Sequence, residues 1–183
     1  MKTQYAMPEH LTGSELKEYR LRLGLTQKAL ADFAAVSKKT VERWESSDSP
    51  IRGPIVPLLR ILADKPGMLS RYEIPPASKG VRLWYMYRSV PCTLIDVNDR
   101  EKTVSIHNFT SDNQFRAFGA NESPTYQDYD SFLKSRCFPE SRDKLKLVLK
   151  DLDLPFYDPL LIVEKTEGRM AEDDFWIRIE KKA

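Results

Sequence analysis

Basic and hydroxyl side chains gather at the start of one expected helix in the first third of the chain. The segment VSKKTVERWE begins at Val36, and its first turns carry Lys38, Lys39, Thr40 and Arg43. Such groups donate hydrogen bonds to base edges and neutralise phosphates, which is the chemistry of a helix in a DNA major groove. Two adjacent lysines can also belong to an ordinary solvated helix face. We favour DNA contact because of the elements that surround them.

Two short helices joined by a tight turn would hold these side chains in place. Leu30 and Phe33 give the first helix one apolar face, and Val41 and Trp44 do the same for the second helix at i and i+3 spacing. An aromatic side chain at this spacing is more often a core residue than a base-stacking one. We therefore expect Trp44 to pack inward.

Three capping residues and one proline mark the starts of four helices in this region. Thr12 begins a T-x-x-E capping box with Glu15, and Thr26 and Ser37 are favourable N-caps for the next two helices. Pro54 suits the first turn of a fourth helix. The helices would share one small apolar core.

The segment from Thr12 to Leu69 resembles the lambda-repressor-like, XRE-type helix-turn-helix family. The resemblance is carried by LTQKALA, by VSKKTVERWE and by SPIRGPIVPLLRIL behind them. It implies an all-α DNA-binding domain of four to five helices over residues 11–70. The helix at 37–45 would enter the major groove.

Nine side chains are candidates for DNA contact: Thr26, Gln27, Lys28, Ser37, Lys38, Lys39, Thr40, Arg43 and Arg52. In the family, Gln27 and Lys28 lie where side chains and amides hold phosphate and support the recognition helix. Thr40 can meet a thymine methyl group or a phosphate, and Arg43 a guanine edge or a phosphate. Arg52 follows the helix, where a backbone contact is expected.

The distribution of charge agrees weakly with this interpretation. Residues 1–70 hold eleven basic and eight acidic side chains, a net charge of +3, which leaves −1 for the rest of a chain of net charge +2. Glu42 and Glu45 would repel phosphate. We expect them to face sideways or inward, toward a cation such as Arg20 or Arg22.

A proline-rich stretch separates this region from a second one. Residues 71–80, with Pro75 and Pro76, form neither helix nor strand easily and predict an extended linker. Residues 81–183 predict a compact α+β domain for sensing, assembly or partner binding. Strands are expected at 81–88, 92–97, 103–109 and in the AEDDFWIRIE tail. Helices are expected from Ser123-Pro124 to about Arg136, after Ser141, and from Asp158-Pro159 to Gly168.

The histidines and cysteines do not suggest catalysis. His107 stands in an expected strand without a neighbour at ligand spacing, and His10 lies apart from it. Cys92 and Cys137 are far apart and outside any CxxC pattern, so we expect reduced, partly buried thiols. No catalytic residue, metal site or cofactor is predicted from these side chains.

The acidic residues offer only a weak alternative. Asp158 with Glu164 and Lys165 loosely resembles a nuclease carboxylate and lysine set, but the order is E-K rather than E-x-K. The acidic run 172–174 could bind a cation, although a charged loop before an apolar strand explains it more simply. An enzyme whose second domain is catalytic is therefore the third hypothesis.

Residues 132–177 resemble a domain of small regulators encoded beside HipA-type kinase toxins in bacteria. The shared features include DPL at 158–160 and GRMAEDDFWI at 168–177. The resemblance implies an antitoxin as the second hypothesis, with a toxin bound through residues 81–183. Exposed aromatic residues would form the partner surface: Trp84, Tyr85, Tyr87 and Trp176.

The first hypothesis is a bacterial sequence-specific transcriptional regulator, more often a repressor than an activator, that binds double-stranded DNA. One such domain covers few base pairs, so a homodimer on adjacent half-sites is expected. The composition, 41% hydrophobic and 31% charged, is that of a globular protein. No apolar run is long enough for a membrane span and no signal-peptide core is present, so a cytoplasmic location, on the nucleoid when bound to its operator, is expected.

Overall fold

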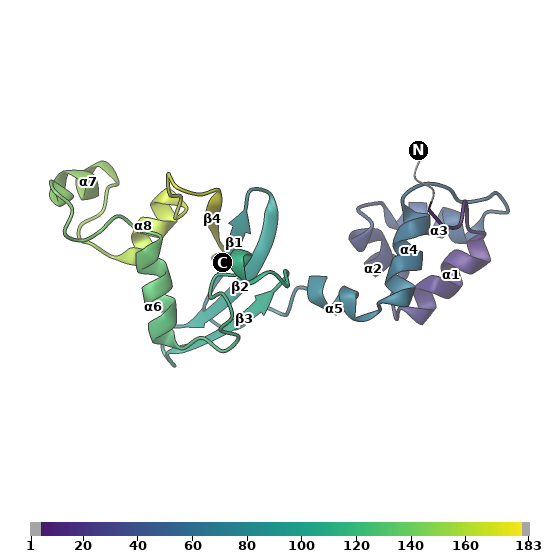
Figure 1. Cartoon of the computed structure of the whole chain (residues 1–183), viewed down its shortest axis with the longest axis horizontal. Coiled ribbons are helices and arrows are strands. Elements are labelled where there is room, and N and C mark those ends of the chain that lie inside the picture. The colour runs from purple at the N-terminus through teal and green to yellow at the C-terminus, as the bar shows by residue number, and fades with distance from the viewer. Residues whose placement is uncertain (1–4, 181–183) are drawn as a thin grey trace. The chain divides into compact units, whose positions relative to one another are not determined.

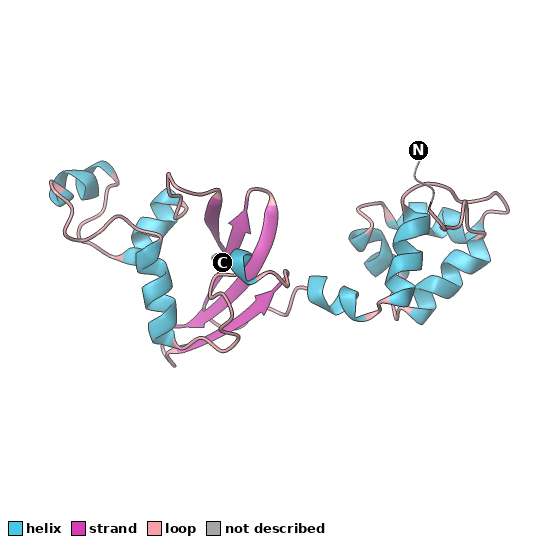
Figure 2. Ribbon diagram, viewed as in Figure 1, coloured by secondary structure: helices cyan, strands magenta, loops and turns pink. Residues whose placement is uncertain are grey.

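A computed structural model describes residues 5–180, which form two compact units that divide after Glu73 (Figure 1). The first unit is helical and contains α1 (Gly13–Arg22), α2 (Gln27–Phe33), α3 (Lys38–Ser46), α4 (Ile55–Asp64) and α5 (Gly67–Tyr72). The second contains β1 (Val81–Tyr87), β2 (Val90–Asn98), β3 (Thr103–Asn108), the short 3-10 helix η1 (Asn113–Phe115), α6 (Tyr126–Ser135), α7 (Leu145–Asp151), α8 (Pro159–Thr166) and β4 (Phe175–Glu180). The predicted α+β class is confirmed (Figure 2). Among these residues, no helix is long and apolar enough to span a bilayer.

The caps predicted for the first three helices are formed. The Thr12 hydroxyl accepts from the Glu15 N–H, and Glu15 Oε2 accepts from the Thr12 N–H at 2.7 Å, which completes the capping box. The Thr26 and Ser37 hydroxyls accept from backbone N–H groups at 3.0 and 3.1 Å. The three helices therefore begin where the sequence predicts, and α1 ends before Gly24, whose φ is +70°.

The helical unit has one core, in which Leu16, Leu30, Val41 and Leu59 are fully buried. Trp44 packs against this core, as predicted. The expectation for Phe33 was wrong, because Phe33 ends α2 and lies outside the core. Its half-buried ring instead makes an edge contact with Tyr72 of α5, with centroids 6.4 Å apart.

Gly13, the first residue of α1, lies close to the backbone of α3. A Cβ on Gly13 would lie 2.6 Å from the Trp44 carbonyl oxygen and 2.8 Å from that of Glu45. Because both are backbone atoms, one helix would have to move. We expect Gly13→Ala to destabilise this unit by about 1–3 kcal/mol, measured by urea denaturation. A wild-type midpoint would show that α1 and α3 are packed less closely.

The second unit is built on an antiparallel sheet of order β3-β2-β1-β4. Leu83 faces Ile95 on one side and Ile179 on the other. This face of the sheet packs against α6 and α8, and the core between them includes Phe132 and Ile162 (Figure 1). The three strands of the predicted meander are confirmed within two residues, and the tail forms β4.

The other face of the sheet carries a second, smaller apolar cluster. Trp84 is stacked on Phe109, with centroids 5.8 Å apart, and Trp176 packs against the cluster. Trp84 is 6% exposed and Tyr85 is 8% exposed, on opposite faces. Together with the half-buried Tyr87, they do not form the exposed partner surface that was expected. Because β1 carries apolar side chains on both faces of the sheet, other residues pack against both faces.

The helix boundaries in the second unit differ from the prediction. The N-cap of α6 is Thr125, in a capping box with Asp128, and not Ser123. The helix expected after Ser141 begins only at Leu145, without a side-chain cap, because Lys144 has a left-handed backbone conformation. Neither Ser123 nor Ser141 is used as a cap.

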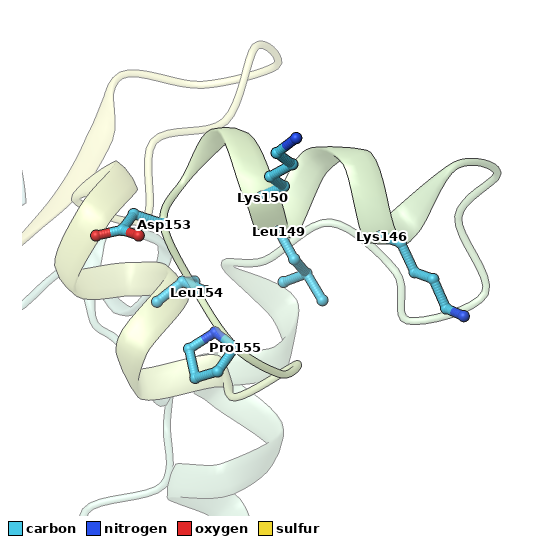
Figure 3. Close-up of a pocket in the computed structure, with 6 residues that line it drawn as sticks. All are labelled: Lys146, Leu149, Lys150, Asp153, Leu154 and Pro155. Atoms are coloured by element: carbon cyan, nitrogen blue, oxygen red, sulfur yellow. The ribbon is translucent and has the colours of Figure 1, made fainter.

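Helix α7 is only partly buried. Among its apolar residues and its C-cap, Leu149 is buried, whereas Leu145, Val148 and Leu152 are half-buried. Leu149 belongs to the core of the sheet unit and also lines a hollow with Leu154 (Figure 3). Helix α7 is short and lies at the edge of the unit, so few neighbouring residues are available to cover its apolar face.

The predicted linker is partly attached to the second unit. The buried Arg82 guanidinium donates to the carbonyl oxygens of Pro75 and Pro76, both at 3.1 Å, and forms an ion pair with Asp96 at 2.6 Å. These contacts occupy the charged end of a side chain that would otherwise be costly to bury. The proline pair thus packs as a part of the sheet unit.

Candidate nucleic-acid interface

Helix α3 is oriented by its one fully buried residue, Val41. At about 100° per residue, positions two before and two after Val41 lie on the opposite side of the helix. These positions are Lys39 and Arg43, and both are exposed. The exposed face of α3 therefore presents two cations one turn apart.

A buried polar network fixes the carboxyl-terminal half of α3. Arg20 of α1 pairs with Glu45 at 2.5 Å and donates to the Leu25 carbonyl at 2.8 Å. The Gln27 side-chain amide donates to the other Glu45 oxygen at 2.8 Å. Arg20 and Glu45 are 9% and 7% exposed in their side chains. The expectation that Glu45 faces inward toward Arg20 is confirmed, and α1, α2 and α3 are joined at one point.

The protonation state of Glu45 follows from this network. Burial raises the pKa of Glu45, but the hydrogen bonds from Arg20 and Gln27 and the Arg20 charge outweigh burial. The pKa therefore lies below its ordinary value of 4.5. Glu45 is thus a carboxylate at neutral pH, and its charge is turned away from the exposed face of α3.

Two of the nine candidate side chains serve as N-caps, and a third contacts one of them. The Thr26 and Ser37 hydroxyls each accept from a backbone N–H, and the Thr40 hydroxyl lies 2.9 Å from that of Ser37. The Gln27 side-chain amide donates a hydrogen bond to Glu45. These four residues hold the turn and the helix start in place, so a role in DNA contact would be in addition to a structural one.

The five basic candidates divide into two groups. Lys28 pairs with Asp32 and Lys38 with Glu42, both at 2.9 Å and both exposed. Exposed i,i+4 pairs contribute little and break easily. Lys39, Arg43 and Arg52 form no ion pair with any other residue in the range 5–180. Their charges are thus available to an external anion.

The placement of Arg52 depends on a contact that the sequence does not reveal. Leu11 and Ile51 form an isolated antiparallel bridge, with N–H···O distances of 3.0 and 2.8 Å. This bridge ties the loop after α3 to the residues before α1. An isolated bridge leaves no periodic pattern in the sequence. The apolar character of Leu11 and Ile51 is the one sequence signal for this contact.

Three of the acidic side chains considered for catalysis have structural roles. Asp173 pairs with the buried Arg136 at 2.6 Å, and this hydrogen bond outweighs burial to keep the Asp173 pKa below its ordinary value. Asp174 pairs with Arg88 at 2.7 Å, and Asp158 caps α8. In the described part of the chain, no group of three or more His, Cys, Asp or Glu residues is placed to hold a metal ion.

A comparison with known families gives one match, to a family model described as helix-turn-helix, over residues 16–59. No curated protein and no solved structure matches the chain. The match begins in α1 and ends in α4, and so it includes α2, the turn and α3. It confirms the XRE-type resemblance, whereas the resemblance of residues 132–177 stays a prediction. Residues 16–59 therefore match an XRE-type helix-turn-helix domain, which supports a function as a DNA-binding regulator.

Proposed function

We propose that this chain is a sequence-specific transcriptional repressor that binds double-stranded DNA as a homodimer. The observation that carries the proposal is the pair Lys39 and Arg43, exposed on one face of α3 with no ion-pair partner among residues 5–180. In this binding mode, α3 lies in the major groove and these two side chains meet base edges or phosphates.

The remaining candidates would act around this pair. Lys28 and Lys38 are exposed in the first turns of α2 and α3, and Arg52 is exposed in the loop after α3, where they can neutralise phosphates. The network of Arg20, Gln27 and Glu45 keeps the orientation of α3 fixed. Two copies would be needed because half-sites about one helical turn apart give useful affinity and specificity.

The proposal is tested by selecting a preferred duplex from genomic DNA and measuring its binding at several salt concentrations. The logarithm of the binding constant should fall linearly with that of the salt concentration, because phosphate contacts release counterions. The selected duplex should bind at least about 1,000-fold more tightly than a scrambled one. Equal binding of both duplexes would contradict a sequence-specific regulator.

An antitoxin is the second candidate function, supported by the surface around α7. Leu147 and Phe156 are 57% and 58% exposed, an unusual arrangement for large apolar side chains so close in sequence. Beside them, Lys146 and Lys150 flank the hollow that Leu149 lines (Figure 3). The hollow is also lined by Asp153, and apolar side chains within a charged rim suit a protein partner.

The antitoxin function is separated from the first by the product of the adjacent gene. Co-purification of that product with the wild-type chain, and its loss with a Leu147→Asp/Phe156→Asp variant, would support it. A neighbouring product that is not toxic when expressed alone would count against it. The same variant should still bind DNA, because both substitutions lie outside the helix-turn-helix.

For both candidates we propose a binding function and not a catalytic one. The support is that Asp158, Asp173 and Asp174, three of the acidic residues considered for catalysis, have structural roles. Cleavage of DNA that depends on a divalent metal would contradict this.

A further inference from the structure

Strand β4 is an edge strand of the sheet, with β1 on its one paired side. In an antiparallel pair, alternate residues direct their N–H and C=O groups toward the partner strand. The Arg88 N–H donates to the Asp174 carbonyl at 3.1 Å, and this residue pair continues the register of β1 and β4. The even-numbered residues of β4 therefore direct their backbone N–H and C=O groups toward β1. The Ile177 N–H accordingly points outward, where it donates to the Glu167 carbonyl at 2.7 Å.

The first half of this outer edge is closed, and the second half is open. The Phe175 N–H donates to Asp173 at 3.0 Å, and the Phe175 carbonyl accepts from Arg136 at 2.9 Å. The outer edge is open after the Ile177 N–H. Within the described chain, no hydrogen bond is formed on this side by the Ile177 carbonyl or by the N–H and carbonyl of Ile179. Unpaired edge groups of this kind are a template for another strand.

The side chains of this open half are complementary to themselves. Arg178 and Glu180 have opposite charges, are both exposed, and share one face of the sheet because they are two residues apart. If two copies pair antiparallel about a two-fold axis at Ile179, Arg178 lies opposite the partner's Glu180, and the reverse pair forms as well. Ile179 then exchanges two N–H···O=C bonds with the partner's Ile179.

Other pairings lack this complementarity. A two-fold axis at Arg178 would place two arginines opposite each other, which is unfavourable. The opposite edge of the sheet, β3, presents Thr103, Ser105 and His107 on the equivalent face and offers no pair of opposite charges. The charge pattern therefore singles out β4 and one register.

A hollow beside the open edge leaves room for a second strand. It lies between α8 and β4 and is lined by Val163, Glu164, Glu167, Ile177, Arg178 and Ile179. Because Ile177 and Ile179 pack on the apolar core of the sheet, a partner's isoleucine placed there would extend that core.

We infer that two copies of this chain associate through β4, paired antiparallel about Ile179, so that two four-stranded sheets become one continuous sheet. This inference builds on the homodimer of the proposed function and names its interface. It is tested without DNA, so a failure of this interface and a failure of DNA binding are told apart.

The test is a charge exchange at positions 178 and 180, followed by sedimentation equilibrium over a range of protein concentrations. Arg178→Glu places two acidic pairs across the two-fold axis, and Glu180→Arg places two basic pairs there. Each single substitution should raise the dimer dissociation constant about tenfold or more. The double variant Arg178→Glu/Glu180→Arg restores both opposite-charge pairs, so its dimer should return to near wild-type affinity.

A mixture of the two single variants gives an independent measurement. Each chain then meets a partner of opposite charge, and a heterodimer should form although neither variant dimerises well alone. Both residues touch Trp84, through the Arg178 guanidinium over its ring at 4.9 Å and the Glu180 bond to its Nε1 at 3.2 Å. Circular dichroism is needed to confirm that each variant is folded, and Lys146→Glu on α7 is the matched charge reversal away from the edge.

Three results would overturn the inference: a wild-type chain that stays at 21.2 kDa at every concentration, single variants that dimerise like the wild type, or a double variant that is no better than the singles. A protein that dimerises as expected and ignores DNA would instead refute the proposed function alone.

Discussion

Replacing Lys39 and Arg43 together by alanine is expected to weaken binding to the selected duplex by roughly 100-fold or more. Each side chain that meets a base edge contributes about 1–3 kcal/mol, and every dimer loses two copies of both. Neither residue has an ion-pair partner in the chain from 5 to 180, and both are exposed. Their loss should therefore leave the fold intact, and fluorescence anisotropy with labelled duplexes measures the effect.

The matched control is Lys146→Ala/Lys150→Ala, which removes the same charge from α7. This control should bind within about threefold of the wild type, because attraction at a distance is screened by salt. The single variants then assign roles. Discrimination lost at one base position identifies a base contact, and weaker binding to all sequences identifies a phosphate contact. Similar losses in both double variants would mean that overall charge, and not α3, determines affinity.

Replacing Arg20 by alanine is expected to destabilise the helical unit by about 3 kcal/mol or more. The substitution leaves the Glu45 carboxylate buried without its ion-pair partner, and breaking a buried pair from one side typically costs about 3–5 kcal/mol. The Leu25 carbonyl also loses its donor. Hydrogen exchange of α1 to α3 in the full chain should show the loss, while the amides of the sheet keep their protection.

The double variant Arg20→Met/Glu45→Met is the control for this prediction. It removes both charges and fills their space with apolar atoms, so it should be more stable than Arg20→Ala. If Arg20→Ala has the protection of the wild type, the network does not hold α1 and α3 together.

The same network predicts the behaviour of the helical unit in acid. Because the Glu45 pKa is lowered in the folded chain, the stabilisation is complete above its ordinary value of 4.5 and is lost as the pH falls through the folded value. In Arg20→Ala the bond and the charge of Arg20 are lost, and burial, the Gln27 bond and the Lys17 charge still act on Glu45. The Glu45 pKa therefore moves up toward its ordinary value, and less stability is lost in acid than in the wild type. A pH titration of urea denaturation compares the two proteins.

Local signals explain which parts of the fold were predictable. A capping box such as Thr12 with Glu15 involves neighbours in the chain, and so its geometry follows from the sequence. The start of α6 was misplaced because Ser123-Pro124 and Thr125 offer competing caps, and the choice depends on Asp128. Similarly, the run LWYMY in β1 is apolar at every position, so the sequence does not show which side chains share a face. In the folded sheet, Tyr85 and Trp84 belong to different apolar clusters.

The candidate interface was predictable to a similar extent. The inward orientation of Glu45 could be inferred because a carboxylate near phosphate is unfavourable, and the structure supplies Arg20 as its partner. The pairing of Lys28 with Asp32 and of Lys38 with Glu42 follows from their i,i+4 spacing in the sequence. Contacts between distant segments, such as Leu11 with Ile51 or Arg82 with the linker, need the folded chain.

The central claim, that α3 reads the major groove, is tested most directly by dimethyl sulfate footprinting on the selected duplex. Methylation at guanine N7 reports the major groove, and methylation at adenine N3 reports the minor groove. We expect guanine N7 atoms to be protected in two half-sites about one helical turn apart, and this protection should disappear with Lys39→Ala/Arg43→Ala. Protection confined to adenine N3, or an N7 pattern that the double substitution leaves unchanged, would contradict the account.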